Sequence, residues 1–160
     1  MPTLTLTTPI KAPIEICFDL SRSIDLHQLS TAHTKEKAIA GVTKGLIEMG
    51  EQVTWRAKHL GVFQTLTSKI TAYDFPIYFQ DTMQKGAFKS MVHDHCFRQE
   101  GELTIMEDIL KYESPLWTLG KLADFLFLKN YLYNLIEIRN KMIKGVAENG
   151  EWKKILQLNF

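Results

Sequence analysis

The stretch MVHDHCF, residues 91–97, places two histidines one residue apart in an otherwise apolar run. Imidazole groups at this spacing can hold a metal ion, exchange protons, or sit as hydrogen-bonded polar groups in an apolar wall. Which of these roles is open to His93 and His95 depends on the direction in which they point. That direction is set by the elements that carry them.

The segment from about residue 36 to residue 112 alternates between apolar and polar residues, which is typical of half-buried β-strands. The gaps in this pattern are short and contain turn residues, so consecutive strands must pair antiparallel. The pattern predicts a meander of six strands: Glu36–Ile47, Glu51–Leu60, Val62–Tyr73, Ile77–Gln84, Phe88–Gln99 and Glu102–Tyr112.

Further elements are predicted on both sides of the meander. TLTLTT near the N-terminus predicts one more strand, and the apolar spacing in residues 11–30 predicts two short helices. Apolar residues at helical spacing predict a long helix over about 116–148, ended by Asn149-Gly150. A curved antiparallel sheet wrapped around this helix buries all the apolar faces. We therefore predict an α+β fold with a seven-stranded antiparallel sheet, in a single domain over residues 1–160.

Strand alternation also predicts which side chains face the helix. In each strand the more apolar of the two sets should point inward. The polar side chains that fall in these inward sets are His59, Asp81, His93 and His95.

Asp81 is the expected neighbour of the two histidines. A turn centred near Gly86 or Ala87 would place Asp81 opposite Met91 or His93, and directly opposed side chains lie about 5 Å apart. His59 comes from a strand two away from that of Asp81, so it would approach only if the sheet curls strongly.

Three interpretations of this polar cluster remain open. The groups can be structural and hydrogen-bonded to one another, they can anchor a ligand in an apolar pocket, or they can form a metal or proton-transfer site. Two imidazoles and a carboxylate suit zinc or iron, and a histidine held by an aspartate can act as a general base. HxH alone is a weak metal-binding pattern, so we assign no metal or other cofactor. We prefer the interpretation in which the cluster anchors a ligand over the one in which it is a catalytic site.

Aromatic side chains on the strands extend the candidate site. Trp55, Phe63, Phe79 and Phe88 could line a cavity, although strand aromatics more often belong to the core. The predicted ligand-contacting residues are Trp55, His59, Phe79, Asp81, Phe88, Met91, His93 and His95. Arg56 and Lys58 are expected on the outer face, and His27 and His33 on the surface in a loop.

Composition limits the partners. The 160 residues include 19 basic and 18 acidic ones, so the net charge of +1 gives no reason to expect nucleic acid or an anionic membrane surface. No segment is long and apolar enough to span a bilayer. No signal peptide is evident, and the two cysteines, Cys17 and Cys96, lack a metal-binding spacing, so we expect a cytoplasmic protein. The apolar excess of FLFLKNYLYNL allows a homodimer or a protein partner.

The segment IKAPIEICFDL resembles the opening of START-like proteins of the polyketide-cyclase/dehydrase type, the SRPBCC superfamily. VTWRAKHLGV, FQDTMQKGAFKSMVHDHCF and LGKLADFLFL are similar to a bacterial branch of it. The resemblance implies the helix-grip fold, with an apolar cavity between sheet and helix. It also implies binding of lipids or other hydrophobic small molecules, and in a minority of members cyclisation or related reactions.

These observations lead to one main hypothesis and one alternative. The main hypothesis is a non-enzymatic protein that binds a hydrophobic or amphipathic small molecule between the sheet and the C-terminal helix. The alternative is a cyclase/dehydrase-like enzyme in which Asp81 and His93 or His95 serve as an acid/base pair or as metal ligands. Neither the ligand nor the reaction is named by the sequence.

Overall fold

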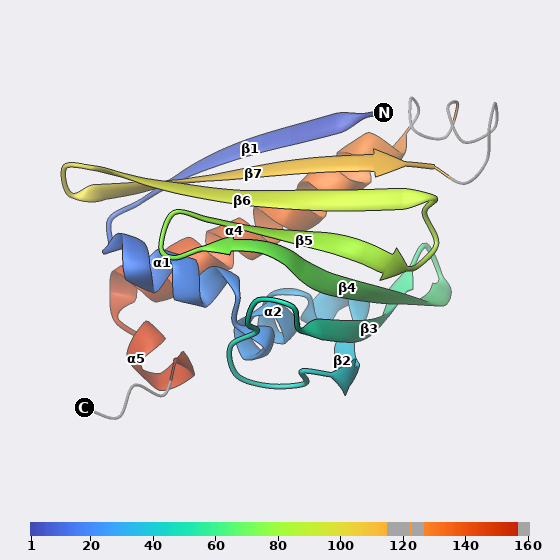
Figure 1. Ribbon diagram of the computed structural model, residues 1–160, viewed down its shortest axis with the longest axis horizontal. Helices are drawn as coiled ribbons and strands as arrows, with labels where there is room; N and C mark the ends of the chain where they lie inside the picture. The colour runs from blue at the N-terminus through green and yellow to red at the C-terminus, as the bar shows by residue number, and fades with distance from the viewer. Residues whose placement is uncertain (115–121, 123–126, 157–160) are drawn as a thin grey trace.

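Seven antiparallel strands form one open sheet in the order β1-β7-β6-β5-β4-β3-β2 (Figure 1). The computed structural model describes residues 1–114, 122 and 127–156. Six strands follow one another as a meander, and β1 pairs with the last of them. The strands are β1 (Thr3–Ile10), β2 (Lys37–Gly41), β3 (Gln52–His59), β4 (Val62–Asp74), β5 (Tyr78–Lys85), β6 (Ser90–Glu100) and β7 (Leu103–Glu113).

The helices lie on one side of this sheet (Figure 1). Between β1 and β2 come α1 (Ile14–Ser21), α2 (Ile24–Ser30) and the 3-10 helix η1 (Ala32–Thr34). The long helix α4 (Lys129–Asn149) runs behind the sheet and is followed by the short α5 (Trp152–Ile155).

Local sequence explains where these helices begin and end. Ser23 precedes α2, and its hydroxyl accepts a hydrogen bond from the backbone N–H of Leu26 (3.2 Å), as an N-cap does. Helix α4 ends at Gly150, whose φ of +83° is readily adopted only by glycine. The predicted stop at Asn149-Gly150 is confirmed.

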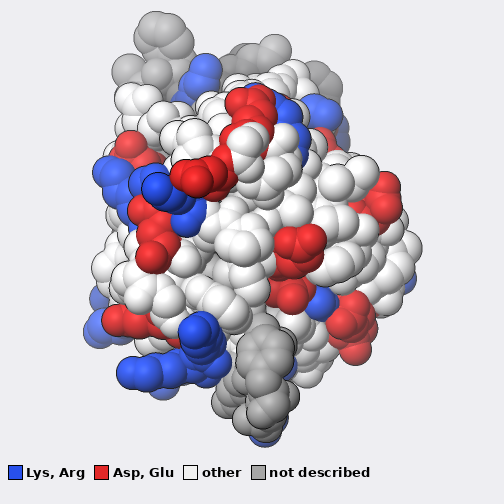
Figure 2. Space-filling model, turned by 90° about the vertical axis from the view of Figure 1, so that its left-hand side faces the viewer, with Lys and Arg blue, Asp and Glu red and all other residues white. Residues whose placement is uncertain are grey.

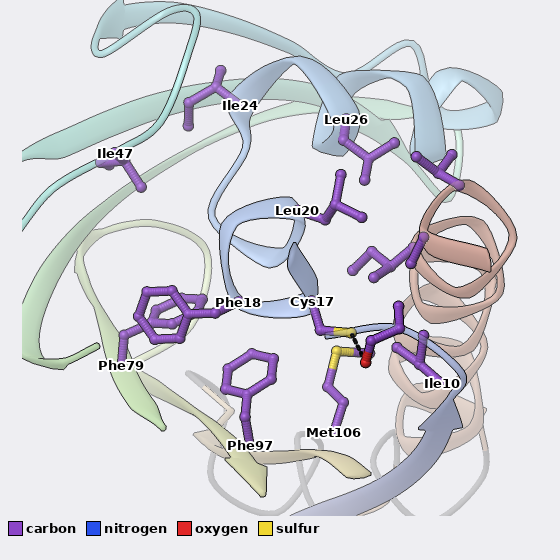
Figure 3. Packing of buried hydrophobic residues seen from close by; sticks show 14 of the residues in the cluster. Ile10, Cys17, Phe18, Leu20, Ile24, Leu26, Ile47, Phe79, Phe97 and Met106 are labelled. Atoms are coloured by element: carbon purple, nitrogen blue, oxygen red, sulfur yellow. Dashed lines mark hydrogen bonds between the residues drawn. The ribbon is translucent and has the colours of Figure 1, made fainter. Parts of the chain in front are cut away.

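The centre of the larger hydrophobic core is Phe18 on α1, which is fully buried (Figure 3). Its ring lies 5.1–5.3 Å, centroid to centroid, from four other aromatic rings: Tyr73, Phe75, Phe79 and Phe97. Three of these contacts are edge-to-face, the geometry that aromatic pairs prefer. The cluster fixes α1 against β4, β5 and β6, and therefore fixes one end of the sheet.

The predicted fold is confirmed, with two differences in detail. The strand predicted over Glu36–Ile47 is only Lys37–Gly41. Gly41 has a φ of +73°, and a Cβ there would lie 2.1 Å from the carbonyl oxygen of Gln52, so the chain turns out of the sheet at this glycine. The predicted helix over 116–148 is observed from Lys129 onward, and residues 116–121 and 123–126 lie outside the described part of the chain.

Charge and hydropathy of the described residues agree with the composition. Figure 2 shows both acidic and basic side chains on the face that it presents, with uncharged surface between them, so this face carries no field of a single sign. Within the described residues, every helix is too short or too polar to cross a lipid bilayer.

We predict that Phe18→Ala lowers the free energy of unfolding by about 3–5 kcal/mol, because it removes a buried ring that four others contact. Phe63→Ala is the matched control. Phe63 is 44% exposed, so we expect a loss below about 1 kcal/mol. Urea unfolding followed by circular dichroism measures both values, and similar losses would contradict the assignment of these rings to core and surface.

Candidate functional site

An apolar cavity of about 300 Å³ lies between the sheet and α4. Strands β3 to β7 form one wall and α4 the other, with α2 at one side. Most of the wall is hydrocarbon and aromatic, with side chains that include Trp55, Leu66, Phe79, Phe88, Leu132 and Leu135. Such a space favours an apolar guest, because few wall groups can bind water in its place.

A polar cluster interrupts this apolar wall on three adjacent strands. Asp81 on β5 is paired opposite His93 on β6, and His95 on β6 is paired opposite Asp108 on β7. Nε2 of His95 donates a hydrogen bond to Oδ2 of Asp81 (2.9 Å). Nε2 of His93 donates one to Oδ1 of Asp108 (2.9 Å). Two histidines and two carboxylates therefore alternate across the strands.

The expected closeness of Asp81 and His93 is confirmed, but their hydrogen bonds go elsewhere. Asp81 and His93 are opposed about a turn centred at Ala87, as predicted. Their nearest charged atoms are nevertheless 4.0 Å apart, and Asp81 bonds the diagonal neighbour His95 instead. The reason is that Asp108, on the other side of β6, binds Nε2 of His93.

Asp108 connects the cluster to the helices. Nδ2 of Asn140 on α4 donates a hydrogen bond to Oδ2 of Asp108 (2.6 Å), and Nη1 of Arg139 contacts Oδ1 (3.4 Å). Arg139 also donates to the backbone carbonyl of Ser21 at the end of α1 (2.8 Å). Nδ1 of His95 lies 2.9 Å from the same Oδ1, although it is not aligned as a hydrogen bond. Because Asp108 is 1% exposed, these groups replace the water that a carboxylate needs.

Both carboxylates are held ionised. Burial alone would raise the pKa of Asp81. The hydrogen bond from His95 and the electrostatic interaction with His93 outweigh this effect and lower the pKa to about 2. Burial opposes ionisation of Asp108 as well. The hydrogen bond from His93, the close contact with His95 and the charge of Arg139 hold its pKa well below the usual range.

The pKa values of the two histidines are shifted in opposite directions. Burial, together with the nearby His95, lowers the pKa of His93 despite its bond to Asp108. Burial would also lower the pKa of His95, but its contacts with Asp108 and Asp81 outweigh this and raise it. His95 therefore holds its proton in preference to His93. The centroids of the two rings lie 3.9 Å apart.

His59 lies in the cavity wall apart from this cluster. Its Nδ1 is hydrogen-bonded to the hydroxyl of Tyr131 on α4 (2.8 Å), and burial lowers its pKa. Among the described residues, no hydrogen bond or ion pair joins His59 to Asp81. The bond to Tyr131 joins the end of β3 to the beginning of α4.

All eight side chains predicted to contact a ligand line the cavity: Trp55, His59, Phe79, Asp81, Phe88, Met91, His93 and His95. Their contact with a ligand stays a prediction. The inclusion of Phe63 among the cavity aromatics was wrong. Phe63 pairs across the hairpin with Lys58 on the outer face, and the guanidinium of Arg56 lies 4.0 Å from the centre of its ring.

The prediction that His27 lies in a surface loop was also wrong. His27 belongs to α2, pairs with Glu36, and places its ring 4.3 Å from that of Trp55, on the border of the cavity. The spacing of Ile24 and His27, three residues apart on one helix face, is the sequence signal for this position.

Sequence reasoning missed three members of the cluster: Asp108, Arg139 and Asn140. The same alternation that turned Asp81 inward also applies to β7, where Asp108 stands between the inward residues Met106 and Leu110. On α4, Arg139 lies four residues before Ile143, within the predicted apolar face. A polar residue in an apolar stripe was therefore the available signal for each.

Ionisation of Asp81 predicts a pH-dependent stability. The pKa is about 2 in the folded protein and about 4 in an unfolded chain, so the ionised group stabilises the fold above about pH 4. This contribution is lost as the pH falls from about 4 to about 2. We expect Asp81→Asn to reduce the free energy of unfolding at pH 7 by on the order of 2 kcal/mol, and by progressively less toward pH 3.

Urea unfolding of wild type and variant at a series of pH values measures this difference. The same pair in a His95→Gln background is the control, because it lacks the hydrogen bond that most strongly favours ionisation. There the pH dependence should be weaker. A difference that stays constant between pH 7 and pH 3 would exclude Asp81 as its source.

No protein-family model and no curated protein matches the chain. Several solved structures match it in fold. TTHA0849 from Thermus thermophilus is 18% identical with a TM-score of 0.71, over 92% of this chain and 100% of that one. A START superfamily protein from Mycobacterium smegmatis is 13% identical with a TM-score of 0.68, over 91% and 96%. Major latex-like protein 151 from Panax ginseng is 18% identical with a TM-score of 0.67, over 91% and 97%.

Identities this low establish the architecture alone. The order of the elements, the open seven-stranded sheet and the long helix across it agree with all three structures. The chain therefore has the START-like helix-grip fold.

Proposed function

We propose that the chain is a single domain that binds a hydrophobic or amphipathic small molecule in the cavity between the sheet and α4. The observation that carries the proposal is an apolar cavity of about 300 Å³ with one polar cluster in its wall. This volume is at the lower end of the range for small-molecule sites, which are commonly apolar with a few placed polar groups. The START-like fold supports the same function, because the resemblance in sequence implies a cavity of this kind.

The chemistry of the polar cluster indicates what the ligand carries. The side chain of Asp81 is 28% exposed and that of His93 14% exposed, and both border the cavity. Asp81 is an ionised acceptor, and His93 uses its Nε2–H on Asp108, so its Nδ1 is an acceptor too. A ligand with a hydroxyl or amine group at one end of a hydrophobic body fits these acceptors.

A cytoplasmic location is part of the proposal. Cys17 and Cys96 are both free thiols, as expected in a reducing compartment.

An enzymatic function is the second candidate, and the orientation of His93 favours it. Asp108 binds Nε2 of His93, which leaves Nδ1 facing the cavity with a lone pair, as in a general base oriented by a carboxylate. In that case the chain would act as a cyclase/dehydrase-like enzyme on a substrate with an acidic C–H or O–H group.

We predict that filling the cavity weakens binding of an apolar probe. Ala57 is 3% exposed and lines the cavity, so the larger side chain of Ala57→Leu takes up part of its space. We expect N-phenyl-1-naphthylamine, a neutral amine that fluoresces in apolar surroundings, to bind at least tenfold more weakly to this variant. Ala40→Leu is the matched control, since Ala40 is exposed on β2. Equal affinities in all three proteins would place the probe outside the cavity.

The natural ligand can be identified by native mass spectrometry of the purified protein, followed by organic extraction. We predict a bound molecule with a hydrophobic body and a hydroxyl or amine group. Incubation of the extracted molecule with wild type and with His93→Gln separates the two functions. A product formed only by wild type supports an enzyme, whereas recovery of the unchanged molecule from both supports a binding protein.

A further inference from the structure

Asp81, His93 and His95 each place one potential ligand atom within 4.8 Å of the other two. Oδ2 of Asp81 lies 2.9 Å from Nε2 of His95 and 4.0 Å from Nδ1 of His93. All three side chains come from the paired strands β5 and β6, and all three line the cavity. One nitrogen of each imidazole and one carboxylate oxygen therefore converge on a common point in the wall.

The opposite nitrogen of each ring contacts a single carboxylate. Asp108 Oδ1 lies 2.9 Å from Nε2 of His93 and 2.9 Å from Nδ1 of His95. Histidines that bind metals nearly always direct their second nitrogen to a carboxylate, a carbonyl or water, which fixes the tautomer and turns the lone pair toward the ion. Here Asp108 accepts a hydrogen bond from Nε2 of His93 and lies beside Nδ1 of His95, with Nδ1 of His93 and Nε2 of His95 left to face Asp81.

Hydrogen bonds within the cluster leave one acceptor, Nδ1 of His93, without a partner among the described residues. A proton on Nε2 of His95 satisfies the contact between His95 and Asp81. Among the described residues, Nδ1 of His93 has no hydrogen-bond partner, and the nearest charged atom is another acceptor, Oδ2 of Asp81 at 4.0 Å. A lone pair on Nδ1 of His93 and a negatively charged oxygen of Asp81 that lie this close together favour a cation between them.

We propose that Asp81, His93 and His95 bind a divalent first-row transition metal ion at the wall of the cavity. Two imidazoles and one carboxylate are the ligand set of non-haem iron sites and of catalytic zinc sites, both of which keep open positions. Ligand bonds of about 2.0–2.2 Å would separate the ligand atoms by roughly 3.0–3.5 Å, so the ring of His93 must move by about 1–2 Å toward Asp81 and His95. The ion takes the place of the proton between His95 and Asp81, and its open positions face the cavity.

The surrounding charges suit a cation at this place. Arg139 and Asn140 contact Asp108, and no ion pair joins Arg139 to Asp81 among the described residues. Asp81 therefore retains its negative charge for the ion. Ser68 donates a hydrogen bond to Oδ1 of Asp81 (2.9 Å), which orients the carboxylate so that Oδ2 faces the two rings.

The metal site does not depend on the proposed apolar ligand, because the three ligand atoms come from the protein alone. Where both bind, an oxygen or nitrogen atom of the ligand can occupy an open position on the ion. Failure of metal binding would leave the probe experiment with Ala57→Leu unaffected, and failure of probe binding would leave the metal experiment unaffected.

The test uses the full chain without an affinity tag, after dialysis against a chelator. Zn²⁺, and Fe²⁺ under anaerobic conditions, are titrated by calorimetry, and bound metal is measured by elemental analysis. We expect one ion per chain. We expect at least tenfold weaker binding to Asp81→Asn and to His93→Gln, since each lacks a ligand atom. His33→Ala, which removes an exposed histidine, should bind as wild type does.

Asp108→Asn tests the positioning role of Asp108, for which a loss of about 10–100-fold in affinity is expected. Because Asp108 is buried, this variant is compared only if its circular dichroism spectrum matches that of wild type. Co²⁺ in the wild-type protein gives a readout that needs no substitution. We expect visible absorption bands of a nitrogen- and oxygen-ligated ion and shifted proton resonances from two imidazoles.

Two results would overturn the proposal. One is the absence of stoichiometric binding of Zn²⁺, Fe²⁺ and Co²⁺ to wild type. The other is equal affinity in wild type, Asp81→Asn and His93→Gln, because binding would then take place at another part of the chain.

Discussion

Asp108 is an ionised carboxylate with 1% of its surface exposed, between the sheet and α4. A charge in this position is tolerated only with several partners, and Asp108 has them on both sides: the two histidines on β6, and Arg139 and Asn140 on α4. Loss of one partner of a buried ion pair commonly costs about 3–5 kcal/mol. Few arrangements of helix and sheet satisfy all these contacts, so Asp108 specifies how α4 lies against the strands.

The same residue separates the two hydrophobic clusters of the molecule. Met106, two residues before it on β7, belongs to the cluster centred on Phe18. Leu110, two residues after it, belongs to a second cluster with Leu132 and Ile136 of α4, and all three of these residues line the cavity. The polar network therefore stands between the two clusters, both of which contribute side chains to the cavity wall. Its acceptor atoms on Asp81 and His93 border the cavity, where they can bind a ligand.

The secondary structure, and the side of each strand to which a side chain points, were predictable because both depend on local sequence. Alternation with a period of two turned Asp81, His93 and His95 inward, and the short turn around Ala87 fixed their register. Phe63 was misassigned because it pairs with Lys58 on the outer face, which the pattern of a single strand does not show. His27 was misassigned because its burial arises from the packing of α2 over Trp55, a contact between elements distant in sequence.

The sequence by itself determined the elements, the meander and the wall on which the histidines stand, since each follows from periodicity and turn length. Only the tertiary structure decided which nitrogen of each imidazole faces which carboxylate. The partners of Asp108 on α4 are 31 and 32 residues away in the chain, and they reach it because helix and sheet pack around a shared core. Those long-range contacts set the orientation of both rings. They are the reason why the two histidines of MVHDHCF present one nitrogen each toward Asp81 at the cavity.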